Sequence, residues 1–244
     1  MTERIRKPRR QRRTREAVEK DVMNAVTTLI EEVGFTNVTL TGVAQRAQIE
    51  ASVFYRRYDN LDELFDVYVR KFDYWLSGLA ELMPTDLSDE DTYKWIMRSL
   101  THALYKNRGM QQLLIWELVE DNYVTKRTAT MREKVNESLI RLMEARFQHT
   151  GLDMNVITAH MISGIYYLIL HKNMSKFCDV DFSTRKGRER LDNGLDQLIS
   201  IIFANKNYQQ EKADIAAKLR AEGVSEEIIA KCVSLNPPVD TSEE

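Results

Sequence analysis

The most informative pattern of apolar and polar residues lies between residues 39 and 58, TLTGVAQRAQIEASVFYRRY. In the first part of this stretch, Leu40, Val43, Ala44 and Ala47 recur at helical spacing. That spacing places their side chains on one stripe of a short helix. Thr39 stands directly before it and is a residue type that favours the N-cap position. The pattern therefore predicts a helix that begins at about residue 40 and buries one face.

A second short helix is predicted from about Ala51, after a turn at residues 48–50. Its periodicity directs Val53, Phe54 and Tyr58 toward the interior. Its outer face carries Ser52, Tyr55, Arg56 and Arg57. Two short helices around a tight turn form a helix-turn-helix, whose second helix can lie in the major groove of DNA.

The rest of the chain also has helical periodicity, and no alternating run typical of a strand is found. Helices are expected over residues 14–33, 61–82, 88–107, 110–120, 125–149, 153–172 and 184–204, with a small helical hairpin after residue 205. The predicted fold is all-α, with an N-terminal three-helix helix-turn-helix domain and a larger helical domain after it. The expected limits are 1–15 for a basic arm, 16–60 for the helix-turn-helix domain, 61–205 for the larger domain, and 206–244 for an accessory hairpin with an acidic tail.

Charge is distributed unevenly along the chain. The net charge is -2, yet residues 1–15 contain eight arginine or lysine residues and a single glutamate. A basic arm on an acidic body indicates a local polyanionic partner, because the body as a whole would repel one. Such arms can lie along phosphates or enter a minor groove. The candidate contacts in the arm are Arg9, Arg10, Arg12 and Arg13; the alternative is a solvated tail without a fixed contact.

Several residues between 34 and 64 carry a resemblance to a known family. They are Gly34, Phe35, Val38, Thr39, Leu40, Val43, Ala44, Ala47, Ile49, Phe54, Tyr55, Tyr58 and Leu64. Together with the amphipathic helix before them, residues 16 to about 66 resemble the DNA-binding domain of the TetR (tetracycline-repressor-like) family. The remainder is similar only in length and helical pattern. The resemblance implies a dimeric transcriptional regulator, most often a repressor that a small-molecule effector releases from a palindromic operator.

Three positions depart from the family pattern. Gln48 stands where the family usually has glycine, so a left-handed backbone with some strain is expected there. Arg57 replaces a common aromatic residue. Leu61 replaces a frequent phosphate-binding lysine, which puts that contact in doubt.

The second helix supplies the expected contacts to DNA. Arg56 is the best candidate for bidentate recognition of a guanine, with Arg57 close behind. Consecutive helical residues point about 100° apart, so one of the two arginines is expected on a phosphate. Base contacts are also expected from Ala51, Ser52 and Val53, and the resemblance implies phosphate contacts from Tyr55 and Thr41.

The larger domain is predicted to serve dimerisation and sensing. Its two late helices pair a face of small residues, which includes Gly164, with an aliphatic stripe that runs from Leu191 to Ile202 beside Gly194. The resemblance implies that these helices meet their copies across a two-fold axis; the alternative is an ordinary intramolecular core. The aromatic residues expected to line an effector pocket are Tyr105, Trp116, Tyr123, Phe147, Tyr166 and Tyr167, although at helical spacing most residues of this kind are simply core.

The sequence contains no motif or segment that indicates a membrane protein, a secreted protein, a metal site or an enzyme. No apolar run reaches the ~20 residues that span a bilayer, and no secretory signal is evident, so a soluble, cytoplasmic protein is expected. Cys178 and Cys232 are far apart, which favours reduced thiols over a disulfide or a metal site. No phosphate-binding, dinucleotide-binding or hydrolase motif is present, so neither an enzyme nor a cofactor is expected. The remaining alternative is an architectural or constitutive DNA-binding protein whose large domain serves assembly or a protein partner.

Overall fold

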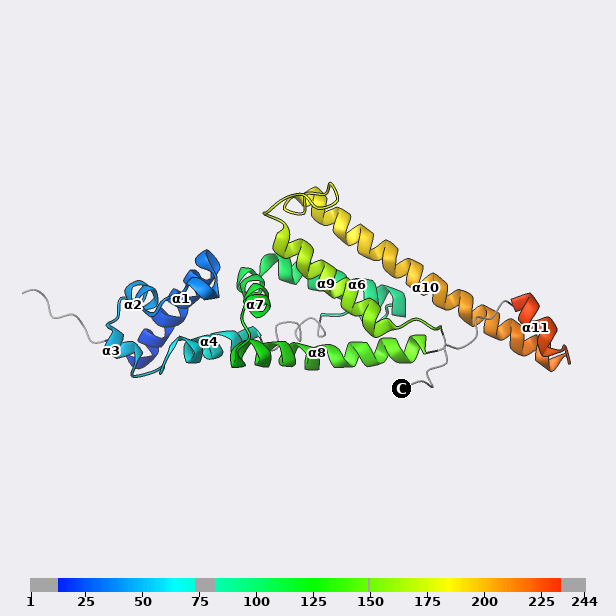
Figure 1. The fold of residues 1–244 in the computed structure, drawn as a ribbon, viewed down its shortest axis with the longest axis horizontal. Coiled ribbons are helices and arrows are strands. Elements are labelled where there is room, and N and C mark those ends of the chain that lie inside the picture. The colour runs from blue at the N-terminus through cyan, green and yellow to red at the C-terminus, as the bar shows by residue number, and fades with distance from the viewer. Residues whose placement is uncertain (1–12, 73–81, 149, 234–244) are drawn as a thin grey trace, which may run out of the picture. The chain divides into compact units, whose positions relative to one another are not determined.

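The computed structural model describes residues 13–72, 82–148 and 150–233 (Figure 1). Its α-helices are α1 (Arg15–Val33), α2 (Leu40–Arg46), α3 (Ala51–Phe54), α4 (Leu61–Val69), α6 (Asp89–Lys106), α7 (Arg108–Val119), α8 (Tyr123–Phe147), α9 (Met154–His171), α10 (Arg185–Ala221) and α11 (Glu226–Val233), with short 3-10 helices η1 (Phe35–Asn37) and η2 (Arg70–Phe72). Within these residues the extended backbone pairs only at an isolated bridge between Phe177 and Val180. The all-α prediction is confirmed.

The chain forms two compact units. Of the described residues, 13–72 and 108–130 belong to the first unit, and 82–107, 131–148 and 150–233 belong to the second. The segment 108–130 therefore belongs to the same unit as the helix-turn-helix, whereas the sequence placed it in a regulatory domain of residues 61–205. The predicted domain limits remain a prediction about function, and they differ from the limits of the two compact units.

The first helix has the boundaries that its capping residues predict. The Thr14 hydroxyl accepts a hydrogen bond from the Ala17 amide at 3.2 Å and so satisfies a free N–H at the helix start. At the other end Gly34 has φ of +79° and its amide donates to the Ile30 carbonyl. Between these caps, Val22, Val26 and other apolar residues of the predicted stripe are buried. This helix supports α2 and also packs against α7.

An aromatic cluster fills the core of the first unit. Phe35 stacks on Trp116 with ring centroids 4.4 Å apart and an interplanar angle of 3°. Phe65 and Tyr68 meet the Phe35 ring edge-on at 5.2 and 5.8 Å. Phe35 is 3% exposed and Trp116 is 2% exposed. The single turn η1 thus joins α4 and α7 through one buried ring.

In the second unit, α6 packs against both α9 and α10. Tyr93 of α6 is fully buried, and its hydroxyl lies 2.7 Å from the Thr158 hydroxyl of α9. Polar pairs join α6 to α10: Arg98 pairs with Asp196, and His102 Nε2 lies 2.8 Å from Asp192. This unit therefore has a core and a polar network of its own.

Two predicted helix ends differ from the structure. The helix that begins at Leu61 was expected to continue to residue 82, but α4 ends at Val69 and η2 follows, and residues 73–81 lie outside the described residues. The helix expected to end at Ala204 was predicted too short, because α10 continues to Ala221. No glycine or proline interrupts residues 195–222, so nothing in the local sequence breaks the helix.

The accessory hairpin is formed by the end of α10 and by α11. Gly223 has φ of +78° at the turn. Beyond it, Ile229 and Val233 pack on Ala216, with Leu219 and Val224 at the edge of this small cluster. Arg220 also donates two hydrogen bonds to Glu226 across the turn. The predicted hairpin is confirmed, although it begins as a continuation of α10.

The stacked ring of Phe35 gives a stability prediction. Phe35→Ala should destabilise the first unit by about 3–5 kcal/mol, because it removes a buried aromatic side chain and leaves a cavity against Trp116. Chemical denaturation followed by circular dichroism measures this loss. Thr36→Ala, on the exposed neighbouring residue, is the control and should change stability by less than about 0.5 kcal/mol. Equal effects from the two variants would contradict the assigned core.

Candidate nucleic-acid interface

The helix-turn-helix is built from α2, a short turn and α3. Thr39 caps α2 as predicted, since its hydroxyl accepts from the Gly42 amide at 3.1 Å. Helix α3 begins at Ala51, also as predicted, but its regular part is only four residues long. Hydrogen bonds from the amides of Arg57 and Tyr58 to the Phe54 carbonyl extend the coil by one more turn. The buried ring of Phe54 anchors this second element to the domain.

The turn between α2 and α3 contains the left-handed residue that the sequence predicts. Gln48 has φ of +52°, a conformation that costs free energy for any residue with a Cβ. After it, the Ile49 amide donates to the Ala44 carbonyl at 2.9 Å and closes the end of α2. The expectation of a strained backbone at this position is confirmed.

Arg13, at the end of the basic arm, contacts this turn. Its Nη1 donates to the Ala47 carbonyl at 2.9 Å and to the Asp21 carboxylate at 3.1 Å. Its Nη2 donates to the Gln48 side-chain oxygen at 3.3 Å. The other arginines predicted for DNA contact, Arg9, Arg10 and Arg12, lie outside the described residues.

The outer surface of α3 holds most of the predicted base contacts. Ala51, Ser52, Tyr55 and Arg56 are exposed, and Val53 is partly buried. Tyr55 is 58% exposed although its ring lies edge-on to that of Phe54. Thr41 is exposed in the first turn of α2. The structure therefore brings these six side chains to one helix-turn-helix.

The two neighbouring arginines in the turn that follows α3 have different environments. Arg57 is partly buried, and its Nη1 and Nη2 donate to the carbonyls of Val53 and Arg15 at 3.3 and 3.4 Å. Its Nε is buried without a partner. Arg56 is exposed and forms no hydrogen bond or ion pair within the described part of the chain. Arg57 thus joins the end of α3 to the start of α1, and Arg56 presents its guanidinium to solvent.

Two further positions near the helix-turn-helix bear on phosphate binding. Arg46, at the end of α2, pairs with Glu32 of α1 at 2.8 Å, and this hydrogen-bonded pair lowers the pKa of the Glu32 carboxyl. The start of α4 carries the partly buried Leu61 between exposed Asp59 and Asp62. That end of α4 offers no cation to a phosphate, in line with the doubt raised by Leu61.

The six residues predicted to line an effector pocket are divided between the two units. Trp116 is in the aromatic core of the first unit, where Tyr123 is 74% exposed. In the second unit, Phe147 is buried against Phe203, and Tyr167 is half-exposed and stacks on His171. The other two are partly buried: Tyr166, and Tyr105, whose hydroxyl donates to the Ser183 carbonyl at 2.9 Å. The effector site stays a prediction.

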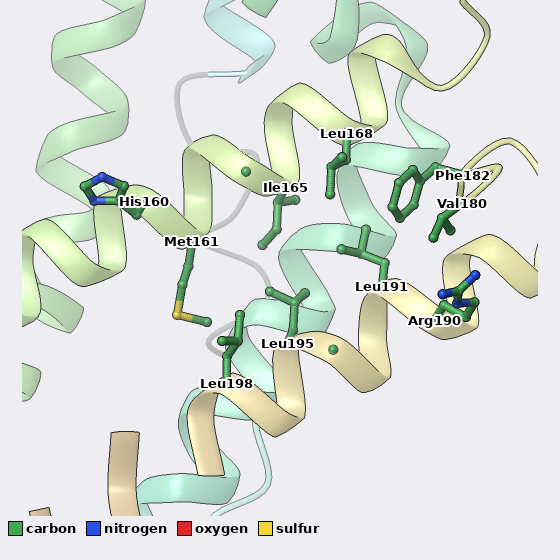
Figure 2. A pocket seen from close by; sticks show the side chains of 12 residues that line it. His160, Met161, Ile165, Leu168, Val180, Phe182, Arg190, Leu191, Leu195 and Leu198 are labelled. Atoms are coloured by element: carbon green, nitrogen blue, oxygen red, sulfur yellow. The ribbon is translucent and has the colours of Figure 1, made fainter. Parts of the chain in front are cut away.

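A groove of about 500 Å³ lies between α9 and α10. Figure 2 shows Met161 and Ile165 of α9 directed toward Leu195 and Leu198 of α10 across it. Its other lining residues are His160, Gly164, Leu168, Val180, Phe182, Arg190, Leu191 and Gly194. The surface is mainly apolar, and Leu198 is 52% exposed. Most of the small and aliphatic residues predicted for dimerisation lie here.

The remaining sequence-level expectations concern cysteines, metals and membranes. Cys178 and Cys232 are both unpaired and exposed. The described residues contain no group of three or more His, Cys, Asp or Glu side chains that could hold a metal ion. Among the same residues, no helix has both the length and the hydropathy required to cross a membrane.

Comparisons with known proteins identify the fold. No protein-family model matches this chain, and no curated protein matches its sequence. Among solved structures, the fatty acid degradation regulator FadR from Bacillus halodurans is similar, with a TM-score of 0.54 and 14% sequence identity. The alignment covers 78% of this chain and 96% of that chain. At this identity the likeness establishes a shared all-helical fold.

The contrast between the two arginines yields a prediction that needs no DNA. Arg57→Ala should lower the free energy of unfolding by about 1–3 kcal/mol, because two backbone carbonyls lose their donor. Arg56→Ala, the matched control one residue away, should stay within about 0.5 kcal/mol of the unsubstituted protein. Thermal or chemical unfolding of the two variants checks this. A larger loss from Arg56→Ala would show that the two roles had been assigned the wrong way round.

Proposed function

We propose that this protein is a sequence-specific transcriptional regulator that binds double-stranded DNA as a homodimer. The observation that carries the proposal is the exposed guanidinium of Arg56 in the turn that continues α3, after an α2 whose first turn Thr39 caps. A second helix held in this way is the element that enters a major groove in helix-turn-helix proteins. The shared fold with a solved regulator supports the same function.

Within this proposal, the side chains of the interface have separate roles. Arg56 recognises a guanine through its O6 and N7 acceptors. Ala51, Ser52 and Val53 lie toward the start of α3 and contact neighbouring base edges. Tyr55 and Thr41 bind phosphates and fix the position of the domain on the duplex. Arg57 acts indirectly, since its donors are occupied by the carbonyls of Val53 and Arg15.

The groove between α9 and α10 is proposed as part of the dimer interface. Its apolar lining and the exposed Leu198 and Ile201 offer a surface that a partner helix can cover. A two-fold dimer places two copies of α3 about 34–36 Å apart, which matches successive turns of the major groove. A palindromic operator follows from that symmetry.

Regulation is proposed to act through a small-molecule effector that relieves repression. Such an effector must bind more tightly to a conformation in which the two copies of α3 no longer match successive grooves. The aromatic residues Tyr105, Phe147, Tyr166 and Tyr167 of the second unit remain the candidates for contact with it. The similar structure is that of a fatty acid degradation regulator, so fatty acids and their derivatives are the first compounds to screen.

Selection from random duplex DNA tests the proposed function. The purified full-length protein should enrich a two-fold palindrome that contains a guanine at a fixed place in each half-site. In Arg56→Ala that guanine should lose its preference, with a cost of about 1–3 kcal/mol per half-site. Sequencing of the selected pools provides the measurement.

Arg185→Ala is the control for this experiment, because it removes an exposed arginine of the second unit, far along the chain from α3. It should select the same palindrome as the unsubstituted protein. Failure of the unsubstituted protein to enrich any sequence, with an affinity that simply falls with salt, would favour a non-specific architectural role.

The glycines of the groove allow the dimer to be tested separately. A Cβ built on Gly164 or Gly194 meets no atom within 4 Å in the single chain. Gly194→Leu should therefore leave the protomer folded, with a gain in helix propensity of up to about 1 kcal/mol. If a partner helix packs there, the same change should raise the dimer dissociation constant at least about tenfold, since overpacking costs about 1–3 kcal/mol.

Sedimentation equilibrium of the variant measures that constant. Asn193→Leu changes the adjacent exposed residue of α10, which does not line the groove, and is the matched control. An unchanged dimer in Gly194→Leu would place the interface elsewhere, and a monomeric unsubstituted protein would rule it out.

A further inference from the structure

Arg13 forms a set of contacts that a phosphate-binding arm does not require. Its guanidinium connects three segments: the Asp21 carboxylate in α1, the Ala47 carbonyl at the end of α2, and the Gln48 side chain in the turn. Two of these three acceptors belong to successive residues, Ala47 and Gln48, in the connection between α2 and α3. Only 33% of the Arg13 side chain is exposed.

The position that Arg13 contacts is the strained one. The positive φ of Gln48 is intrinsically unfavourable for a residue with a side chain. The Ala47 carbonyl belongs to the last turn of α2, where carbonyls have no partner within the helix. Arg13 satisfies this carbonyl and at the same time holds the Gln48 side chain. It therefore stabilises the conformation that redirects the chain from α2 into α3.

We propose that Arg13 is a positioning residue, which holds the turn between α2 and α3 and thereby sets the orientation of α3 for base recognition. This inference rests on the proposed function, and it replaces the direct DNA contact that the sequence predicts for Arg13 with a clamp inside the protein. Its donors Nη1 and Nη2 are directed at protein acceptors rather than at a nucleic acid. The fixed fork of a guanidinium reaches those acceptors together, whereas the single ammonium of a lysine does not.

A clamp and a phosphate contact predict different salt dependence. Loss of one phosphate contact lowers the slope of log K against log salt by about 0.9 for duplex DNA. Arg13→Ala and Arg13→Lys should both weaken binding to the selected palindrome at least about tenfold, with the slope unchanged. A phosphate contact would instead lose slope in Arg13→Ala and keep most of its affinity in Arg13→Lys.

Gln48→Gly supplies a rescue that distinguishes positioning from general damage. Glycine adopts a positive φ without strain, so the turn no longer needs the clamp. Arg13→Ala combined with Gln48→Gly should bind the palindrome within about twofold of Gln48→Gly alone, because the two changes act on one element. Asp21→Asn is the control: it removes the charge of one acceptor but leaves the bonds to residues 47 and 48, and its effect on affinity should be no more than about twofold.

Thermal unfolding gives a second reading that does not depend on DNA. Arg13→Ala should lower the melting temperature by about 4 °C in the Gln48 protein, and by clearly less in the Gln48→Gly protein. Absence of this coupling overturns the clamp, and so does a reduced salt slope with Lys rescue. If the unsubstituted protein selects no DNA sequence, the proposed function and the role of Arg13 in base recognition both fail. If the thermal coupling between Arg13 and Gln48 is nevertheless observed, Arg13 holds the turn, and the error lies in the proposed DNA-binding function alone.

Discussion

The left-handed backbone of Gln48 is the constraint on which the proposed DNA-reading surface depends. Helices α2 and α3 are seven and four residues long, and helices this short are not stable by themselves. Their mutual direction is set by the turn between them and by the residues that secure it. Phe54 anchors α3 from the inside, while Arg13 and Arg57 attach the turn and the end of α3 to the start of α1.

This arrangement divides the cationic residues by role. Arg46 and Arg57 neutralise or satisfy groups of the protein itself, as does Arg13. Arg56 alone among these four is exposed without a partner in the described residues. When an exposed, unpaired arginine side chain binds a guanine, it loses only its hydration. An arginine that is already paired must also break its hydrogen bonds to protein acceptors. Within the proposed function, this difference makes Arg56 rather than Arg57 the residue expected to contact a base.

Local rules account for what the sequence predicted well. Thr14, Thr39 and Ser88 cap helices because a side-chain oxygen meets a free amide three residues on. The positive φ of Gln48 was expected from a single departure from a family pattern. Contacts between segments that are distant in the chain could not be predicted from such local rules. Periodicity showed that Trp116 lies on an apolar face, but not that its ring would stack on Phe35 rather than line a pocket.

The same limit applies to Arg57 and to α10. An arginine on a helix-turn-helix is readily interpreted as a DNA contact, and only the three-dimensional fold shows that its donors reach the carbonyls of Val53 and Arg15. The end of α10 was misplaced because hydrophobic periodicity weakens after Ala204, although residues 205–221 contain no helix breaker. Apolar pattern and helix propensity are separate signals, and here propensity determined the boundary.

The most direct test of the account is an atomic substitution in the DNA. Replacement of the preferred guanine in a selected palindrome by 7-deazaguanine removes the N7 acceptor and leaves base pairing intact. The unsubstituted protein should lose affinity at least about fivefold for this duplex, whereas Arg56→Ala should bind both duplexes equally. An equal loss in the two proteins, or no loss in either, would contradict recognition of that guanine by Arg56.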